Sequence, residues 1–281
     1  MTSRHRAEAR THHPSAGFAQ LLAAEWIKLW ALRSTRWAFP GAAAVVVGIA
    51  ANGSLADHRN WPDYHEGIRA YFVPAWAIRD VFPLASAMVV MLVVGTLGAL
   101  CVVSEYGSGL IRTTFAAVPA RRSVLSAKVV VMAAVTSLFG VLVVAASFAV
   151  SQAILSGRGA HLSPGDPDVL RSLAASASLA PVSALVGLGI GVLLRHGAAT
   201  VAVTALVLLL LPSFVSASEA WTAALTYAMP FHAWSQLAEI PPSFHPPGPF
   251  EPSVFHSWAV LAAWPGVAVA AALAVVRRRD L

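Results

Sequence analysis

The chain has 281 residues, of which 57% are apolar and only 11% are charged. A soluble domain carries about 25% charged residues, so this chain lacks the polar side chains that cover a water-soluble globule. Its net charge is +6, but the basic residues separate long uncharged runs and do not gather on one face, as they do in DNA-binding domains. The single cysteine, Cys101, excludes an intrachain disulfide framework. Composition therefore excludes a soluble enzyme, a disulfide-stapled secreted domain and a disordered chain, and it indicates an integral membrane protein with no nucleic acid partner.

The first 17 residues are expected to form a disordered tail, and residues 18–36 predict an amphipathic helix. Its apolar side chains fall on one arc at 100° per residue, as in a helix that lies along a membrane surface. Glu25 projects from the middle of this arc, which is costly unless the carboxylate is paired. Two explanations remain open, a local pair with Lys28 and a bond to a basic residue of another cytoplasmic element. The residues of the arc are Phe18, Leu21, Leu22, Trp26, Leu29 and Leu32.

Six stretches without Lys, Arg, Asp or Glu are long enough to span a membrane. A spanning helix needs about 20 mostly apolar residues to cross a hydrocarbon core of about 30 Å. We therefore expect an all-α integral membrane protein in which residues 1–281 form one transmembrane domain. A cleaved signal peptide is disfavoured because 36 residues, including Glu8 and Glu25, precede the first stretch. The spans are predicted at about 37–56, 81–104, 129–155, 172–194, 198–218 and 253–276.

The basic residues predict the orientation of these spans. The N-terminus, the loop around 105–128, the turn at 195 and the C-terminus hold 14 Lys and Arg, whereas the opposite loops hold 5. Basic residues flanking spans favour the cytoplasmic side. Both termini are therefore expected in the cytoplasm.

The cytoplasmic loop 104–128 predicts a further short helix over 110–118. Leu110, Ile111, Thr114, Phe115 and Val118 suit one or two amphipathic turns, and the proline that follows at position 119 would end them. Basic residues at 121, 122 and 128 then mark re-entry into the membrane. An ordinary positive-inside loop would explain these basic residues, but it would not explain an apolar stripe that faces the cytoplasm.

The segment before the last span predicts two short helices, Ala220–Met229 and Phe231–Glu239, separated by Pro230. Neither is long enough to cross a bilayer, and the sequence leaves open whether the pair dips into the membrane or caps its outer surface. Within the spans, Gly187-x-x-x-Gly191 matches the small-residue spacing of closely packed helices. That spacing indicates packing and identifies no partner.

Catalytic and cofactor motifs are absent from the sequence. No G-x-x-x-x-G-K-[ST] loop for nucleotide phosphates occurs, and the ten histidines show no metal-ligand spacing. The charge-free stretches also disfavour a secondary transporter, because proton and ion relays use ionisable side chains inside the membrane. We expect no enzymatic activity, no cofactor and no energy source within this chain.

Three segments resemble one family. Ala24-Glu25-Trp26-Ile27-Lys28-Leu29, followed by Leu32-Arg33-Ser34-Thr35, resembles the N-terminal signature of ABC transporter permeases of the second, exporter-like type, especially actinobacterial ones. Glu105-x-x-x-Gly109-x-x-Arg112-x-Thr114, with Pro119-x-Arg121-Arg122 and Lys128, is similar to their loop between spans two and three. The terminal Arg278-Arg279-Asp280 is also similar to the end of many members.

The resemblance implies a permease subunit in a bacterial cell membrane, paired with a second permease and powered by separate cytoplasmic ATPase subunits. It implies an interfacial helix at the N-terminus, a coupling helix between spans two and three, and short extracellular helices before span six. An apolar or amphipathic exported substrate fits the charge-free spans. A non-transporting scaffold or sensor is the alternative, and a homodimer and a heterodimer remain equally open. The residues expected to couple to the ATPase are Glu25, Glu105, Gly109, Ile111, Arg112, Phe115, Arg121 and Arg122.

Overall fold

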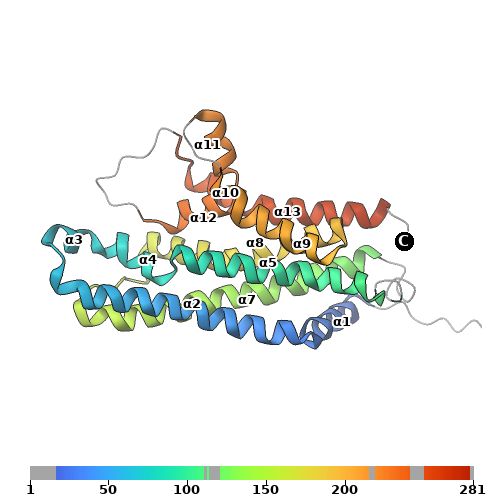
Figure 1. Cartoon of the computed structure of the whole chain (residues 1–281), viewed down its shortest axis with the longest axis horizontal. Helices are drawn as coiled ribbons and strands as arrows, with labels where there is room; N and C mark the ends of the chain where they lie inside the picture. Colours follow the sequence, from blue (N-terminus) through green and yellow to red (C-terminus); the bar gives the residue numbers. More distant parts are fainter. Residues whose placement is uncertain (1–16, 111–112, 114–120, 215–218, 241–249, 279–281) are drawn as a thin grey trace, which may run out of the picture.

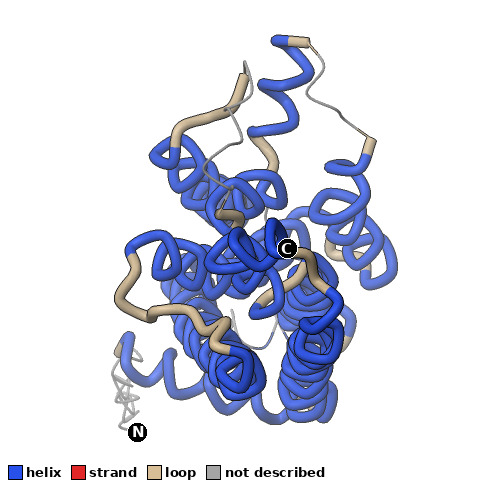
Figure 2. Tube along the Cα trace, turned by 90° about the vertical axis from the view of Figure 1, so that its left-hand side faces the viewer, coloured by secondary structure: helices blue, strands red, loops and turns tan. Residues whose placement is uncertain are grey.

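A computed structural model describes residues 17–110, 113, 121–214, 219–240 and 250–278. Throughout these ranges the regular elements are helices, so the predicted all-α class is confirmed (Figures 1 and 2). Short π-helical turns occupy Phe72–Trp76 and Leu206–Leu210. The α-helices are α1 (Phe18–Ala31), α2 (Arg33–Asn60), α3 (Glu66–Tyr71), α4 (Ala77–Val81), α5 (Leu84–Gly107), α7 (Arg121–Leu155), α8 (Pro167–Leu194), α9 (Gly197–Ala205), α10 (Leu211–Ser213), α11 (Ala220–Tyr227), α12 (Pro230–Ala238) and α13 (Val254–Arg278).

In the described part of the chain, five helical segments are long and apolar enough to cross a membrane. They contain α2, α5, α7, α8 and α13, which matches five of the six predicted spans. Several of these helices extend beyond the uncharged stretches; α7, for example, begins at Arg121 and not at residue 129. Charged residues can continue a helix past its apolar part, so the stretches underestimated helix length.

The predicted span at 198–218 is not confirmed. The helical segment there runs from Gly197 to Ser213, 17 residues, and its π turn and Pro212 interrupt regular α-helix. At 1.5 Å per residue it is about 25 Å long, shorter than a hydrocarbon core of about 30 Å. Residues 215–218 lie outside the described part. The helix ends at Ser213, five residues before the predicted end of the span.

The predicted helix at 18–36 ends five residues early. Leu32 has an extended backbone (φ −73°, ψ 121°), and residues 33–36 form the first turn of α2. Across this break the Arg36 Nε donates a hydrogen bond to the Trp30 carbonyl at 2.6 Å. The apolar periodicity continues through Leu32, so the sequence gave no sign of the break. Residues 1–16, most of the predicted tail, lie outside the described residues.

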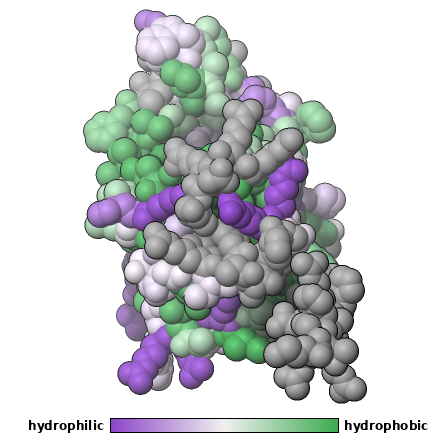
Figure 3. Space-filling model, turned by 90° about the vertical axis from the view of Figure 1, so that its right-hand side faces the viewer, coloured by the Kyte–Doolittle hydropathy of each residue, from purple (hydrophilic) through white to green (hydrophobic). Residues whose placement is uncertain are grey.

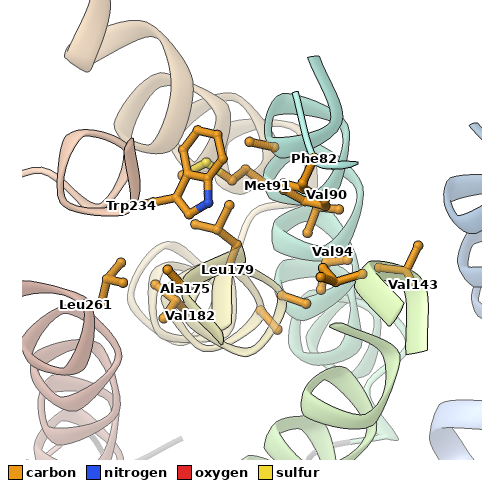
Figure 4. Packing of buried hydrophobic residues seen from close by; sticks show 14 of the residues in the cluster. Phe82, Val90, Met91, Val94, Val143, Ala175, Leu179, Val182, Trp234 and Leu261 are labelled. Atoms are coloured by element: carbon orange, nitrogen blue, oxygen red, sulfur yellow. The ribbon is translucent and has the colours of Figure 1, made fainter. Parts of the chain in front are cut away.

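Helix α8 is the central helix of the bundle. It contacts α5, α7, α9, α12 and α13, and Leu179 and Leu188 on it are fully buried. Figure 4 shows Leu179 packed among side chains of α5 and α12. Helices α5 and α8 cross at glycines: a Cβ at Gly98 would lie 1.9 Å from the Ala184 carbonyl oxygen, and a Cβ at Gly187 would lie 2.0 Å from the Gly95 carbonyl oxygen. The packing role predicted for Gly187 and Gly191 is confirmed, since a Cβ at Gly191 would also lie 3.0 Å from the Ala99 carbonyl oxygen.

The two short helices predicted before the last span are present as α11 and α12. Helix α12 packs against α8, with the Trp234 Nε1 donating to the Ser176 hydroxyl at 3.1 Å. The turn after α11 contacts the middle of α13, where the Trp264 Nε1 donates to the Ala228 carbonyl at 2.7 Å. Trp264 lies ten residues into α13, about 15 Å along it. The pair therefore meets the bundle well inside its length, while α11 points away from it (Figure 1).

Candidate functional site at the α1 end of the bundle

Helix α1 presents one face to the beginning of α7, at the end of the bundle that we call the α1 end (Figure 1). Leu21, Glu25 and Leu29 are buried on this face, at the four-residue spacing of one helix side. Leu21 packs against Val124 and Ala127 of α7. Glu25 therefore lies in the middle of the contact between the two helices, and its carboxylate requires a partner.

Glu25 joins a network of four charged side chains. The Lys128 Nζ donates to the Glu105 Oε1 at 2.9 Å and also to the Glu25 Oε2. The Lys28 Nζ donates to the Glu25 Oε1 at 2.8 Å and lies 3.2 Å from the Glu105 Oε1. Both partners that the sequence offered for Glu25, a local lysine and a basic residue of another element, are thus present. We call Glu25, Lys28, Glu105 and Lys128 the four-charge network.

The four-charge network is largely removed from solvent. Glu25, Glu105 and Lys128 are only 4%, 7% and 8% exposed, while the Lys28 side chain is 27% exposed. Two carboxylates and two ammonium groups balance each other. Buried charges lose several kcal/mol of hydration and recover it only through well-placed partners. The network therefore requires α1, the end of α5 and the beginning of α7 to hold their present positions.

A cavity of about 300 Å³ adjoins the network. Apolar side chains from all three helices line it, among them Leu29, Cys101 and Met132, together with the four charged residues. Among the described residues, no group of three His, Cys, Asp or Glu could hold a metal ion. The paired charges link α1, α5 and α7 beside this cavity.

The structure describes three of the other expected coupling residues, Gly109, Arg121 and Arg122. Gly109 follows the end of α5 with φ +73°, a left-handed conformation that glycine adopts without the steric cost of a side chain. Arg121 and Arg122 open α7, with Arg122 exposed. Ile111, Arg112 and Phe115, and with them most of the predicted coupling helix at 110–118, lie outside the described residues.

Lys128 was predicted only as a marker of membrane re-entry, whereas the structure pairs it with both carboxylates of the four-charge network. It lies two turns into α7, on the same face as Val124 and Val131, and all three side chains are buried. A lysine within an apolar i, i+4, i+7 series was the available signal. Lys28 was considered only as a local partner of Glu25.

The turn between α8 and α9 contributes one more cation to the α1 end. Arg195 has φ +56°, which a non-glycine residue rarely adopts, and its guanidinium lies 4.8 Å from the ring centroid of Tyr106. A cation over an aromatic face contributes about 0.5–2 kcal/mol. Because Tyr106 follows Glu105 in α5, this contact ties the α8–α9 turn to the helix end that carries the network. Figure 3 shows the hydrophilic side chains of this end among apolar ones.

A smaller polar contact lies at the opposite end of the bundle. The Tyr64 hydroxyl donates to the Asp57 Oδ1 at 2.6 Å. Desolvation of the phenol, together with this bond to a carboxylate, raises the pKa of Tyr64 to about 12. The contact joins the end of α2 to the connection that follows it.

Comparison with known proteins does not assign the chain to a family. The chain matches no family model and no curated protein. The functional assignment therefore rests on the motifs and on the geometry of the α1 end.

Proposed function

We propose that the chain is the membrane-spanning permease subunit of an ABC transporter of the second, exporter-like type, powered by a separate ATPase subunit. One observation carries the proposal. Two of the three segments that resemble this family supply all four members of the four-charge network: Glu25 and Lys28 come from the first segment, and Glu105 and Lys128 come from the second. Motifs that lie far apart in the sequence thus meet at one buried site.

The geometry suggests how ATPase movement reaches the spans. An ATPase that contacts α1 or the loop after α5 would push on segments whose charges are shared with α7. Separating them would leave buried charges without partners, at a cost of about 3–5 kcal/mol for each broken pair. The segments therefore move together, and a displacement at the ATPase becomes a displacement of α5 and α7.

The remaining parts of the proposal are taken from the permease family that the three segments resemble. Two permease subunits, identical or paralogous, would form the transport route in a bacterial cell membrane, with both termini in the cytoplasm. The long apolar helices of the described region suit an apolar or amphipathic substrate. ATP would bind to and be hydrolysed by the partner subunit alone, since this chain lacks a phosphate-binding loop.

The test is reconstitution in liposomes with a candidate ATPase subunit, chosen because it copurifies with this chain. The chain alone should show no saturable ATP hydrolysis, and its addition should change the hydrolysis rate of the ATPase. An ATPase variant lacking its phosphate-binding lysine controls for contaminating activity. Hydrolysis by the chain alone, or an ATPase that ignores its presence, would favour the scaffold or sensor alternative.

The predicted coupling helix is tested by Phe115→Asp, with Phe115→Leu as its matched control. Burying one such aromatic side chain at an interface contributes about 1.5–3 kcal/mol. Phe115→Asp should therefore weaken ATPase copurification or uncouple hydrolysis from transport at equal membrane expression, whereas Phe115→Leu should retain both. If Phe115→Asp copurifies and transports like the unmodified chain, this loop is not the coupling element.

A further inference from the structure

The break between α1 and α2 forms an open hollow of about 480 Å³, which we call the elbow hollow. Trp26, Ile27, Trp30, Ala31 and Arg36 line it. Trp26 and Ile27 are 51% and 67% exposed, and neither belongs to the buried set of α1, which is Leu21, Glu25 and Leu29. The hollow is thus separate from the four-charge network, although both use α1.

The elbow hollow contains a positively charged side chain, Arg36, whose position is fixed by a hydrogen bond. The Arg36 Nε donates to the Trp30 carbonyl at 2.6 Å, which fixes the guanidinium and leaves its terminal amino groups without a partner among the described residues. Arg33, one turn earlier, is exposed and forms no ion pair with the described part of the chain. The first turn of α2 contains no acidic residue and no side-chain cap, so its free backbone N–H groups add to the positive potential.

The elbow hollow lies where a boundary of the membrane is expected. Arg33 and Arg36 begin α2, one of the helices long enough to cross a bilayer. Trp37, the next residue, is 79% exposed, and tryptophan is enriched at the level of lipid headgroups. Arginine binds phosphate oxygens with paired N–H groups. The hollow therefore combines an apolar wall, two indoles and the guanidinium of Arg36, and the exposed Arg33 lies one turn away on α2.

We infer that the elbow hollow binds the headgroup of an anionic phospholipid, with its phosphate on Arg33 and Arg36 and its acyl chains along Trp26, Ile27 and Trp37. A lipid is favoured over an acidic protein segment because the arginines lie where a bilayer-length helix begins and the flanking exposed side chains are apolar. The binding holds α1 at a fixed depth beside the membrane and so fixes one side of the four-charge network. It acts whether or not the chain has an ATPase partner.

The experiment places a probe in the hollow. Ile27→Cys in a Cys101→Ser background is labelled with a polarity-sensitive fluorophore and incorporated into phosphatidylcholine nanodiscs with increasing fractions of phosphatidylglycerol. The emission should shift to the blue and saturate as phosphatidylglycerol increases. Each basic residue near an anionic surface contributes about 1 kcal/mol, so Arg33→Gln should raise the half-saturating fraction about fivefold, and Arg33→Gln/Arg36→Gln should raise it further.

Arg59→Gln, an exposed position at the other end of α2, is the matched control and should leave the titration unchanged. Arg33→Gln keeps the test valid if the Arg36 variant fails to fold, since the exposed Arg33 side chain forms no hydrogen bond or ion pair with the described residues. The inference is overturned if phosphatidylglycerol and phosphatidylcholine give the same emission, or if Arg33→Gln titrates like the unsubstituted protein. It is also overturned if inorganic phosphate in pure phosphatidylcholine produces the same shift, or if the shift appears only when an ATPase is added.

Discussion

Lys128 of α7 donates a hydrogen bond to the Glu105 carboxylate of α5 at 2.9 Å, with each side chain only 9% exposed. The same ammonium group also bonds to Glu25 of α1. A single lysine therefore links three helices at one end of the bundle. A buried ion pair contributes little net stability compared with apolar packing, but the loss of one partner is strongly destabilising. The arrangement fixes the relative positions of the helices, which is the property that a coupling element requires.

Lys128→Met should destabilise the protein by about 3–5 kcal/mol, because Glu25 and Glu105 then share only the partly exposed Lys28. The double variant Glu105→Gln/Lys128→Met removes one charge of each sign and should lose less than the sum of the two single variants. The expected coupling energy is about 0.5–3 kcal/mol. Thermal unfolding of the detergent-solubilised variants measures each value.

Lys28→Met serves as the comparison for the variants at positions 105 and 128. Its side chain is 27% exposed, and Lys128 still bridges the two carboxylates in its absence, so the loss should be smaller. Additive effects at positions 105 and 128, or equal losses at positions 28 and 128, would show that the charges do not act as a network.

Gly98→Ala should disrupt the crossing of α5 and α8. The added Cβ would lie 1.9 Å from the Ala184 backbone carbonyl oxygen, which cannot move aside as a flexible side chain can. Overpacking of a core typically costs about 1–3 kcal/mol and sometimes more, and the upper end applies here. Gly48→Ala, in α2, is the matched control because nothing lies within 4 Å of its Cβ position; alanine should be neutral or stabilising there by up to about 1 kcal/mol. Equal Tm values for the two variants would contradict the close approach.

The sequence could predict most of the helices because their signal is local. An apolar run of about 20 residues predicts a membrane helix without knowledge of its neighbours, and α5, α8 and α13 follow such runs. The segment 197–213 does not, because a π turn interrupts its α-helix and the helix ends at Ser213, before the apolar run ends. The break at Leu32 also escaped prediction, since the apolar periodicity continues through it and the Arg36–Trp30 hydrogen bond that spans it is a tertiary contact.

The candidate site could be predicted only in part. Glu25 was identified because an isolated carboxylate on an apolar face requires a partner, and Glu105 because of the family resemblance. Lys128, which bonds to Glu25, is 103 residues away from it in the sequence. No local pattern predicts that α1 and α7 lie in contact. The burial of Lys128 could not be predicted either, because a lysine near a helix end is ordinarily solvated, whereas Lys128 is 8% exposed.

Tyr64 should titrate with a pKa of about 12. Its neutral form is favoured in the folded protein because the phenol is partly desolvated and donates to the Asp57 carboxylate. The resulting stabilisation is fully present below the ordinary tyrosine pKa of about 10 and is lost as pH rises from there to about 12. The tyrosinate absorbance of the unsubstituted protein minus that of Tyr64→Phe isolates this group, and Asp57→Asn should lower its midpoint. A midpoint near 10 in the unsubstituted protein would rule out the contact.

The orientation in the membrane is predicted from the excess of 14 Lys and Arg over 5. The exposed Ser108 follows the end of α5 beside the four-charge network, and the exposed Ser163 follows α7 at the opposite end of that helix. In a Cys101→Ser background, Ser163→Cys should react with an impermeant maleimide added to intact cells. Ser108→Cys should react only after permeabilisation, because its end of the bundle is expected in the cytoplasm. The Cys101→Ser protein without an added cysteine gives the background, and labelling of Ser108→Cys in intact cells would reverse the orientation and place the four-charge network out of reach of any cytoplasmic ATPase.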